Sequence, residues 1–235
     1  MEDLQLLREY AEQRSERAFT EFVNRHMDFV YSTALRLVNE SQLAEDVTQM
    51  VFIHLARKAG SLHNGTVVTG WLYRTTQFVA QTVLRSDWRR RNREWLAMQY
   101  SELNRDSESV WKDVAPLIEE AMGQLRRADQ DAVLLRFFAE KSLREVGEAL
   151  GISDDTAQKR VNRAIGRMRD YFARRGVVVP AALLGSTLAA HTVQAAPIQF
   201  AATLAATVTS GAKTGLGFAT SIKLFQAMLM AKLKA

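Results

Sequence analysis

Apolar residues recur along most of the chain at the 3.6-residue spacing of α-helices. This pattern predicts helices over residues 3–13, 16–39 and 42–57, and a further helix from Trp71 onward. Residues 58–70, between the last two helices, are polar and contain glycine, so we expect a loop there. The helix over 16–39 carries a continuous apolar stripe, made of Phe19, Phe22, Val23, His26, Val30, Ala34, Leu37 and Val38. The chain is therefore predicted to begin with a helical bundle.

A second set of helices follows a polar stretch. Residues 99–114 lack periodicity, which indicates a flexible linker, and Pro116 then suits the start of a helix. Two further helical segments over 142–172 are separated by Gly151, as a tight turn between crossed helices often requires. Ser153 is a good N-cap for the second of them. The pattern predicts an all-α fold with two small helical domains, of which the second contains a helix-turn-helix.

The last helix of this pair is strongly amphipathic. At about 100° per residue, its apolar residues fall on one arc, which contains Ala157, Val161, Ala164, Ile165, Met168 and Phe172. The opposite side is basic and rich in amides, with Thr156, Gln158, Lys159, Arg160, Asn162, Arg163 and Arg167. Such a face suits a recognition helix in the DNA major groove, because Lys and Arg neutralise phosphates and reach guanine edges, while amides pair with adenine. The alternative is the solvated charged face of an ordinary bundle helix.

The helix predicted over 42–57 has polar and apolar residues together on the side away from the core. Asp46, Gln49 and Ile53 group there, and Phe52 flanks them. An exposed isoleucine beside these polar groups indicates a contact surface for another protein. The alternatives are a bundle helix with a slightly apolar surface and a helix that is buried on both sides.

The helix that begins near Trp71 combines aromatic, amide and basic residues. Its core-facing positions are predicted to be Trp71, Leu72, Phe78, Val79 and Val83. The opposite face is formed by Arg74, Gln77, Gln81 and Trp88, with Tyr73 at its edge, and the segment ends in Arg85, Arg89, Arg90, Arg91 and Arg93. Aromatic rings among cations suit unstacked nucleic-acid bases, which stack on the rings while the cations hold phosphates. The alternative is a surface helix whose basic end complements the helix dipole.

Composition narrows the class of function. The chain has no cysteine, so it has neither disulfides nor thiolate metal ligands, and no pair of its four histidines has the spacing of a metal site. The sequence contains no glycine-rich phosphate loop and no nucleophile motif, so we predict no catalytic residue, no cofactor and no metal. The acidic, amphipathic N-terminal stretch does not resemble a signal peptide, so we expect a cytoplasmic protein.

The last part of the chain differs from the rest. Residues 176–235 contain four lysines and no acids, so the net charge of +5 leaves only +1 for everything before them. The segment 177–196 has the length of a membrane span but is rich in alanine, which makes spontaneous insertion marginal. A basic amphipathic helix predicted over 220–235 suits a membrane surface or a protein groove. The alternatives are a membrane span, docking on the chain's own domains or on another protein, and a loosely ordered tail.

Two groups of motifs together resemble a known family. AEDVTQMVF (44–52), GWLYRTTQ (70–77) and the arginine cluster at 89–93 are similar to the first globular domain of bacterial RNA polymerase sigma factors. Residues 124–172 resemble the promoter-binding C-terminal domain of that family, and the order of the two resembles the extracytoplasmic-function-type group of the sigma-70 family. The resemblance covers about residues 1–175 and implies a core-polymerase and minus-ten-element domain at 1–98, a linker at 99–114 and a minus-thirty-five-element domain at 115–175. The Ala-rich helical extension predicted at 176–235 lies beyond it.

The resemblance also implies roles for single residues. It places the polymerase contact, on a coiled coil of the β′ subunit, at Asp46, Gln49, Phe52 and Ile53. It places minus-ten recognition and melting at Trp71, Tyr73, Arg74, Gln77, Gln81, Arg85, Trp88, Arg89, Arg90 and Arg91, with a flipped base held by the loop near 60–70. Minus-thirty-five recognition falls on Thr156, Gln158, Lys159, Arg160, Arg163 and Arg167. Many family members carry Asn and Asp where this chain has Phe78 and Thr82, so its minus-ten readout is expected to differ.

The sequence therefore predicts a non-enzymatic transcription initiation factor that binds core RNA polymerase and promoter DNA. Further expected partners are the β flap of the polymerase and an anti-sigma factor, and the tail adds a candidate contact with the membrane surface. One alternative is a stand-alone helix-turn-helix regulator with an N-terminal interaction bundle. Another is a membrane-tethered adaptor whose basic helices bind anionic lipid.

Overall fold

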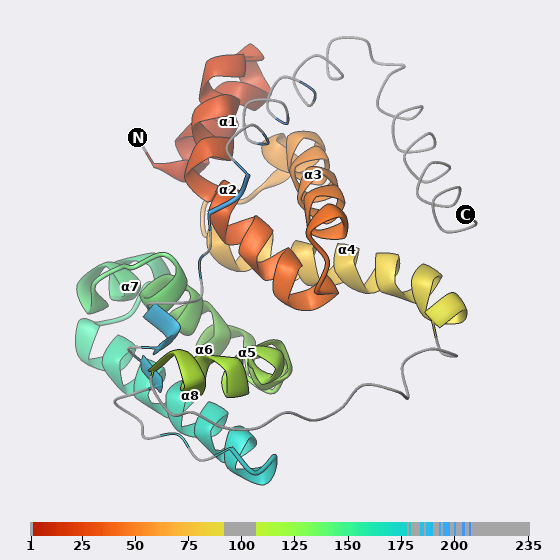
Figure 1. Ribbon diagram of the computed structural model, residues 1–235. Helices are drawn as coiled ribbons and strands as arrows, with labels where there is room; N and C mark the ends of the chain where they lie inside the picture. Colours follow the sequence, from red (N-terminus) through yellow and green to blue (C-terminus); the bar gives the residue numbers. More distant parts are fainter. Residues whose placement is uncertain are drawn as a thin grey trace. The chain divides into compact units, whose positions relative to one another are not determined.

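The computed structural model of the 235-residue chain is helical over most of the part that it describes (Figure 1). The described residues are 2–91 and 107–177, together with 179, 184, 185, 187–189, 193, 195–197, 200, 204 and 207. The chain divides into two compact units. The first contains Met1–Thr66, Thr75–Tyr100 and Ala195–Ala235, and the second contains Val67–Arg74 and Ser101–Gln194.

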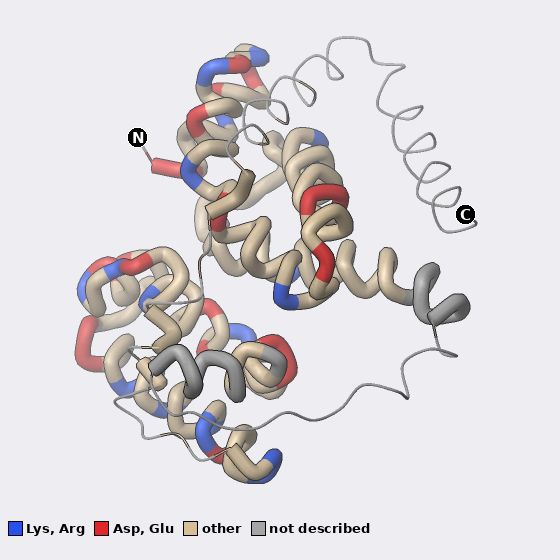
Figure 2. The backbone as a smooth tube through the Cα atoms, in the orientation of Figure 1, with Lys and Arg blue, Asp and Glu red and all other residues tan. Residues whose placement is uncertain are grey.

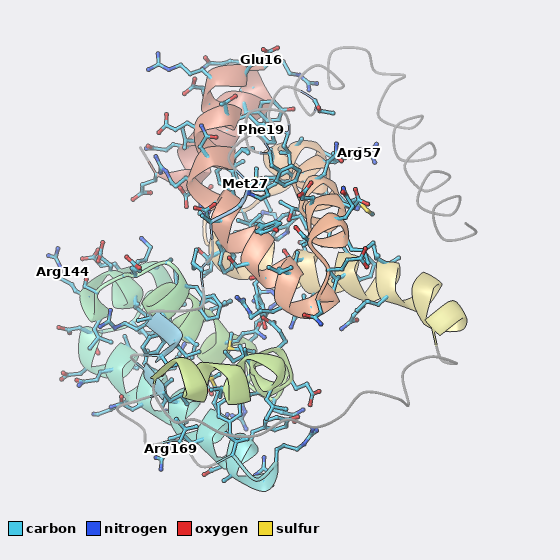
Figure 3. All side chains as sticks on the ribbon, in the orientation of Figure 1. Glu16, Phe19, Met27, Arg57, Arg144 and Arg169 are labelled. Atoms are coloured by element: carbon cyan, nitrogen blue, oxygen red, sulfur yellow. The ribbon has the colours of Figure 1, made fainter. Side chains whose placement is uncertain are left out.

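The first unit is a helical bundle. It contains α1 (Asp3–Gln13), α2 (Glu16–Val38), α3 (Ser41–Lys58), the 3-10 turn η1 (Ala59–Ser61) and most of α4 (Val68–Arg91). Helix α2 packs against both α1 and α3. Phe19 and Met27 point from α2 into the core, whereas Glu16 points outward (Figure 3). The three helices predicted before the first loop are confirmed within one residue at each end.

Short-range signals set the ends of these helices. The Ser15 hydroxyl caps α2 by accepting a hydrogen bond from the Ala18 N–H at 3.3 Å. Helices α1 and α2 are followed by Arg14 (φ 56°) and Asn39 (φ 52°), both in the left-handed region. A residue in this conformation lets its N–H satisfy a carbonyl of the last turn while the chain leaves the helix. Each break between the first three helices is thus encoded locally.

An ionic cluster ties α1 to α2. One carboxylate oxygen of Asp3, the first residue of α1, lies 2.8 Å from Nε2 of His26, and the other lies 3.0 Å from Nη1 of Arg25. Arg25 also pairs with Glu21 at 2.7 Å. Burial alone would raise the pKa of Asp3, but the hydrogen bonds and positive charges of His26 and Arg25 outweigh it and hold that pKa below its ordinary value of 3.8.

We expect Asp3→Asn to lower stability at neutral pH and to flatten its acid dependence. A carboxyl whose pKa is lowered by folding stabilises the fold above its unfolded pKa, and this contribution is lost as the pH falls through the folded pKa. Because the cluster is partly exposed, the loss at neutral pH should be about 1 kcal/mol or less. Denaturant unfolding at a series of pH values measures it. Glu12→Gln, at an exposed position of α1, is the matched control, and parallel pH curves for Asp3→Asn and the wild type would contradict the assignment.

The second unit is built around one long helix. Its elements are α5 (Ser107–Gly123), α6 (Arg127–Val133), the π-helical turn η3 (Leu134–Phe138), α7 (Leu143–Leu150) and α8 (Asp154–Arg174). Helix α8 packs against α5, α6 and α7. Ile118, Met122, Val133 and Phe172 are fully buried in this core. The all-α fold with two helical domains, the second containing a helix-turn-helix, is therefore confirmed.

The linker predicted over 99–114 is too long at its C-terminal end. Helix α5 already begins at Ser107, and Pro116, predicted to open this domain, lies inside the helix. Val114 and Ile118, one turn apart, are both fully buried on the same face. This buried face carries the helix past a proline that removes one backbone donor.

The turn between α7 and α8 uses the residues that the sequence predicts. Gly151 ends α7 with a left-handed φ of 64°, and the Ser153 hydroxyl caps α8 by accepting from the Thr156 N–H at 3.3 Å. Gly147 brings α7 close to this turn, because a Cβ there would lie only 2.7 Å from the carbonyl oxygen of Ile152. The two glycines thus serve the turn in different ways, one through its backbone conformation and the other through its small size.

The first part of the tail packs on the second unit. Val179, Leu184 and Leu188 are buried and belong to that unit. Arg169, on α8, donates a hydrogen bond from Nε to the carbonyl oxygen of Val179 at 3.2 Å. These residues therefore extend the core of the helix-turn-helix unit beyond the end of α8.

The next described residues of the tail pack on the first unit. The Ala196 N–H donates to Oδ1 of Asp28 at 2.8 Å, and the ring of Phe200 lies 6.5 Å from that of Tyr31. Of the alternatives for the tail, the described residues thus show docking on the chain's own domains, and the helix predicted over 220–235 lies outside them. Within the described part of the chain, the helices lack the combination of length and apolar character that crossing a membrane requires.

Candidate nucleic-acid and polymerase interfaces

The outer face of α8 carries the basic and amide side chains that the sequence predicts there. The exposed members are Thr156, Gln158, Lys159, Asn162 and Arg163, and Arg160 is half-buried. The predicted apolar arc faces inward, with Ala157, Val161, Ala164, Ile165, Met168 and Phe172 all buried. Lys and Arg positions recur along α8 (Figure 2). The helix therefore presents a solvent-accessible surface of the chemistry that reads duplex DNA.

Arg167 differs from the other predicted contacts of α8. Its Nη1 donates to Oδ2 of Asp129, on α6, at 3.0 Å. Asp129 is only 3 % exposed, and a buried carboxylate needs such a partner to offset its desolvation. Arg167 thus anchors α8 to α6, and its predicted contact with DNA competes with a structural role.

Two residues predicted to melt DNA are engaged within the second unit. Tyr73 is buried, and its hydroxyl donates to Oε2 of Glu119, on α5, at 2.6 Å. Arg74 pairs through Nη1 with Oδ1 of Asp131, on α6, at 2.7 Å. Gly70 leaves room for this pair, because a Cβ there would overlap Oδ1 of Asp131. In this structure Tyr73 is inaccessible and Arg74 is half-buried, and both bind acidic partners from distant parts of the sequence.

In the rest of α4, the orientation predicted for Phe78 is wrong. Phe78, predicted to face the core, is 68 % exposed. The buried stripe runs through Leu72, Thr76, Val79 and Val83, at spacings of three or four residues, and Phe78 falls outside it. Counting this spacing from Leu72 would have found the exposed ring. Of the other predicted contacts, Trp71 and Gln77 are half-buried and Gln81 is exposed, while the side chains of Arg85, Trp88, Arg89, Arg90 and Arg91 lie outside the described part.

The surface predicted on α3 is less exposed than its sequence suggests. Asp46 and Ile53 are each 8 % exposed, and Phe52 is fully buried. Gln49 is half-buried. Buried side chains occupy most of the circumference of α3, so the prediction of an exposed isoleucine is wrong and the helix is buried on both sides. Periodicity did not reveal this because residues that lie away from the main stripe are buried as well.

The remaining predictions concern the loop before α4 and the absence of a metal site. The loop before α4, where a flipped base is expected, is exposed at His63, Asn64 and Gly65. Among the described residues, no group of three or more His, Asp or Glu side chains is placed to hold a metal ion. Within the described part of the chain, the exposed residues of the predicted DNA contacts thus lie on α8, on α4 and in the loop before α4.

Two helical units, of which the second carries an exposed basic helix-turn-helix, define a DNA-binding protein with a separate N-terminal bundle. Comparison with known families identifies the family of DNA-binding proteins to which the chain belongs. Residues 22–90 match the family model of Sigma-70 region 2, and residues 116–168 match that of Sigma-70, region 4. Together the two matches cover just over half of the chain. The chain belongs to the sigma-70 family, in its extracytoplasmic-function (ECF) group.

Curated relatives agree with this assignment. The chain is 30% identical over 162 residues to ECF RNA polymerase sigma factor SigE of Mycolicibacterium smegmatis, a match that covers 67% of this chain and 62% of the relative. It is 28% identical over 156 residues to RNA polymerase sigma factor CarQ of Myxococcus xanthus, covering 65% and 88%. It is 24% identical over 144 residues to RNA polymerase sigma factor SigV of Bacillus subtilis, covering 61% and 84%. The chain thus spans less than two thirds of the length of SigE and most of that of CarQ. The family resemblance seen in the sequence is confirmed.

Proposed function

We propose that the protein is a cytoplasmic transcription initiation factor. It binds core RNA polymerase, directs it to specific promoters and helps to open promoter DNA, while the polymerase carries out the chemistry. The observation that carries this proposal is the occurrence of region 2 and region 4 in this order in two compact units, with an exposed basic recognition helix in the second. A stand-alone helix-turn-helix regulator would account for the second unit but leaves region 2 without a role.

Promoter recognition in duplex form is assigned to the outer face of α8. The exposed Lys159 and Arg163 supply donors that fit guanine edges or phosphates, and Gln158 and Asn162 supply amides that fit adenine. Both amides lie on the same solvent-accessible side as the cations. This mixture favours base recognition over mere charge neutralisation, because amides add hydrogen-bond patterns that phosphates do not require.

Binding of core polymerase is assigned to α3. Gln49 supports this role best, because it is half-buried whereas Asp46, Phe52 and Ile53 are buried. The buried three support the surface from below, so substituting them would perturb folding as well as binding. Gln49 is therefore the residue at which a polymerase contact can be tested with the least disturbance of the bundle.

We expect Gln49→Ala to weaken binding to core polymerase about fivefold to tenfold, since a side-chain hydrogen bond contributes about 1 kcal/mol. The melting temperature should change little. Titration of labelled factor with purified core enzyme measures the affinity. Gln13→Ala, at the exposed end of α1 and outside the region 2 match, is the matched control. Identical affinities of the two variants would remove Gln49 from the interface.

Run-off transcription tests the function as a whole. Purified core polymerase, the full chain and a library of genomic fragments should give discrete transcripts that are absent without the chain. The same chain should retain core enzyme in a pull-down experiment. Binding to DNA without retention of core enzyme would favour the stand-alone regulator.

Two further partners belong to the same proposal. The β flap of the polymerase would contact the region 4 unit, which the family match supports. Contact of the tail with a membrane surface is supported by sequence alone, because Lys223, Lys232 and Lys234 lie outside the described residues. Near anionic headgroups each lysine would contribute about 1 kcal/mol.

A further inference from the structure

The second part of the tail is held against α2 of the first unit. The Ala196 N–H donates to Oδ1 of Asp28 at 2.8 Å, and the centre of the Phe200 ring lies 6.5 Å from that of Tyr31. We refer to residues 195–204 as the docked segment. Its contacts combine a backbone hydrogen bond with an aromatic pair, so α2 presents a surface that binds a short stretch of polypeptide.

The docked segment is only lightly buried. Its described residues are the buried Leu204, the half-buried Ala196 and Phe200, and the exposed Ala195 and Pro197. The part of the tail on the second unit instead places three apolar side chains in a core. Segments with few buried contacts open locally at a small cost in free energy. The docked segment is therefore suited to leave α2 without unfolding of the bundle.

The chemistry of the docked segment matches a protein competitor and not a mimic of DNA. Residues 176–212 contain no charged side chain, so the segment lacks the carboxylates with which a protein imitates phosphates. Its described contacts with α2 use one backbone N–H and one aromatic ring. A partner that replaces it on α2 is accordingly a polypeptide, which offers the same groups.

The surface under the docked segment borders the start of α3, the helix assigned to polymerase binding. The Tyr31 hydroxyl lies 2.9 Å from Oγ of Ser41, the first residue of α3. Gln49 follows eight residues later in the same helix, which corresponds to about 12 Å. One helix with its side chains is about 10–12 Å across, and a coiled coil is wider. A coiled coil seated on Gln49 therefore extends to the end of α3 beside which Phe200 lies.

We propose that the docked segment is an intramolecular competitor of core RNA polymerase for this face of the first unit. The inference rests on the proposed function and adds a regulation to it. Such a competition is reciprocal, so docking of the tail lowers the apparent affinity for core enzyme, and binding of core enzyme displaces the tail. Any interaction that withdraws the tail from α2 therefore activates the factor.

The test uses the full chain and purified core polymerase. Phe200→Ala, which removes the ring beside Tyr31, should raise the affinity for core enzyme about twofold to tenfold, as expected when an aromatic contact that holds the competitor is lost. Ala196→Pro, which removes the N–H that binds Asp28, should have an effect of similar size. Val193→Ala, at an exposed apolar side chain of the tail that belongs to the second unit, is the matched control and should bind like the wild type.

Hydrogen exchange followed by mass spectrometry reports the docking itself. Amides of residues 195–204 should exchange slowly in the wild type and faster in Phe200→Ala and Ala196→Pro. Excess core enzyme should speed their exchange in the wild type. A synthetic peptide of residues 195–207, added to Phe200→Ala, should lower the affinity of that variant for core enzyme. Melting temperatures should stay close to that of the wild type, because the segment is lightly buried.

Three results would overturn the proposal. In the first, Phe200→Ala and Ala196→Pro bind core enzyme no more tightly than Val193→Ala. In the second, core enzyme leaves the exchange of the docked segment unchanged. In the third, both variants lose melting temperature and affinity together, which would make the segment part of the folded bundle. If neither the wild type nor any variant binds core enzyme, the proposed function itself fails, whereas equal binding by all of them overturns only the competition.

Discussion

Replacing Lys159, Arg160 and Arg163 together by alanine should weaken sequence-specific binding to promoter duplex by about 100-fold or more. All three lie on the outer side of α8, and Lys159 and Arg163 are exposed. A bidentate contact with guanine contributes about 1–3 kcal/mol, and its loss relaxes specificity at one position. A contact with phosphate instead lowers affinity for every sequence and reduces the salt slope by about one unit. Titrations of each single variant at several salt concentrations separate the two roles.

A charge-matched variant controls for bulk electrostatics. Arg126→Ala, Arg127→Ala and Arg174→Ala together remove the same charge at exposed positions of the same unit. This variant should keep its preference for promoter over unrelated DNA. Equal losses in the two triple variants would mean that net charge, and not the recognition face, controls binding. Arg167 is left out of both sets because breaking its ion pair with Asp129 would destabilise the unit.

Gly147→Ala should unfold the helix-turn-helix more readily and weaken promoter binding with it. The added Cβ would lie 2.7 Å from the carbonyl oxygen of Ile152 and 3.2 Å from the backbone nitrogen of Asp154. These are backbone atoms of the turn, so the contact is relieved only by moving α7 away from α8. Overpacking of this kind costs about 1–3 kcal/mol. Denaturant unfolding of the full chain, followed by duplex titration, measures both effects.

Gly166→Ala is the matched control for Gly147→Ala. Gly166 lies within α8, and apart from its chain neighbours and the backbone of its own helix no heavy atom would lie within 4 Å of its added Cβ. Alanine there should raise the free energy of unfolding by about 0.5–1 kcal/mol, because glycine loses more backbone entropy on folding. Two substitutions of the same chemistry should thus have opposite signs. Equal stability of the two variants would show that the close approach at Gly147 relaxes without cost.

Local signals explain what the sequence predicts well. Helix ends depend on residues three or four positions apart, so Gly151 and Ser153 identify the turn of the helix-turn-helix without knowledge of the fold. The inward and outward faces of α8 follow from periodicity in the same way, because that helix has one buried side. In such a helix, spacing alone separates core from surface.

The errors arise where distant residues decide the environment of a side chain. Tyr73 and Arg74 are residue types that bind nucleic acid, yet Glu119 and Asp131, 46 and 57 positions away, engage them. Ile53 looks exposed in its own helix but is buried because α3 is enclosed on more than one side. Neither the acidic partners of Tyr73 and Arg74 nor the burial of the second side of α3 can be recognised from the local sequence pattern. These features require the tertiary structure.

The packing of the tail affects how experiments with a truncated form of this protein are interpreted. The region 4 match ends at residue 168, but the buried interior of the second unit continues through Val179, Leu184 and Leu188. A fragment cut to the family boundaries would lose these side chains and leave the apolar surface beneath them in water, where it promotes aggregation. Poor transcription by such a fragment would therefore record damaged folding instead of a missing regulatory element. The first part of the extension is best treated as part of the helix-turn-helix unit in any dissection of the chain.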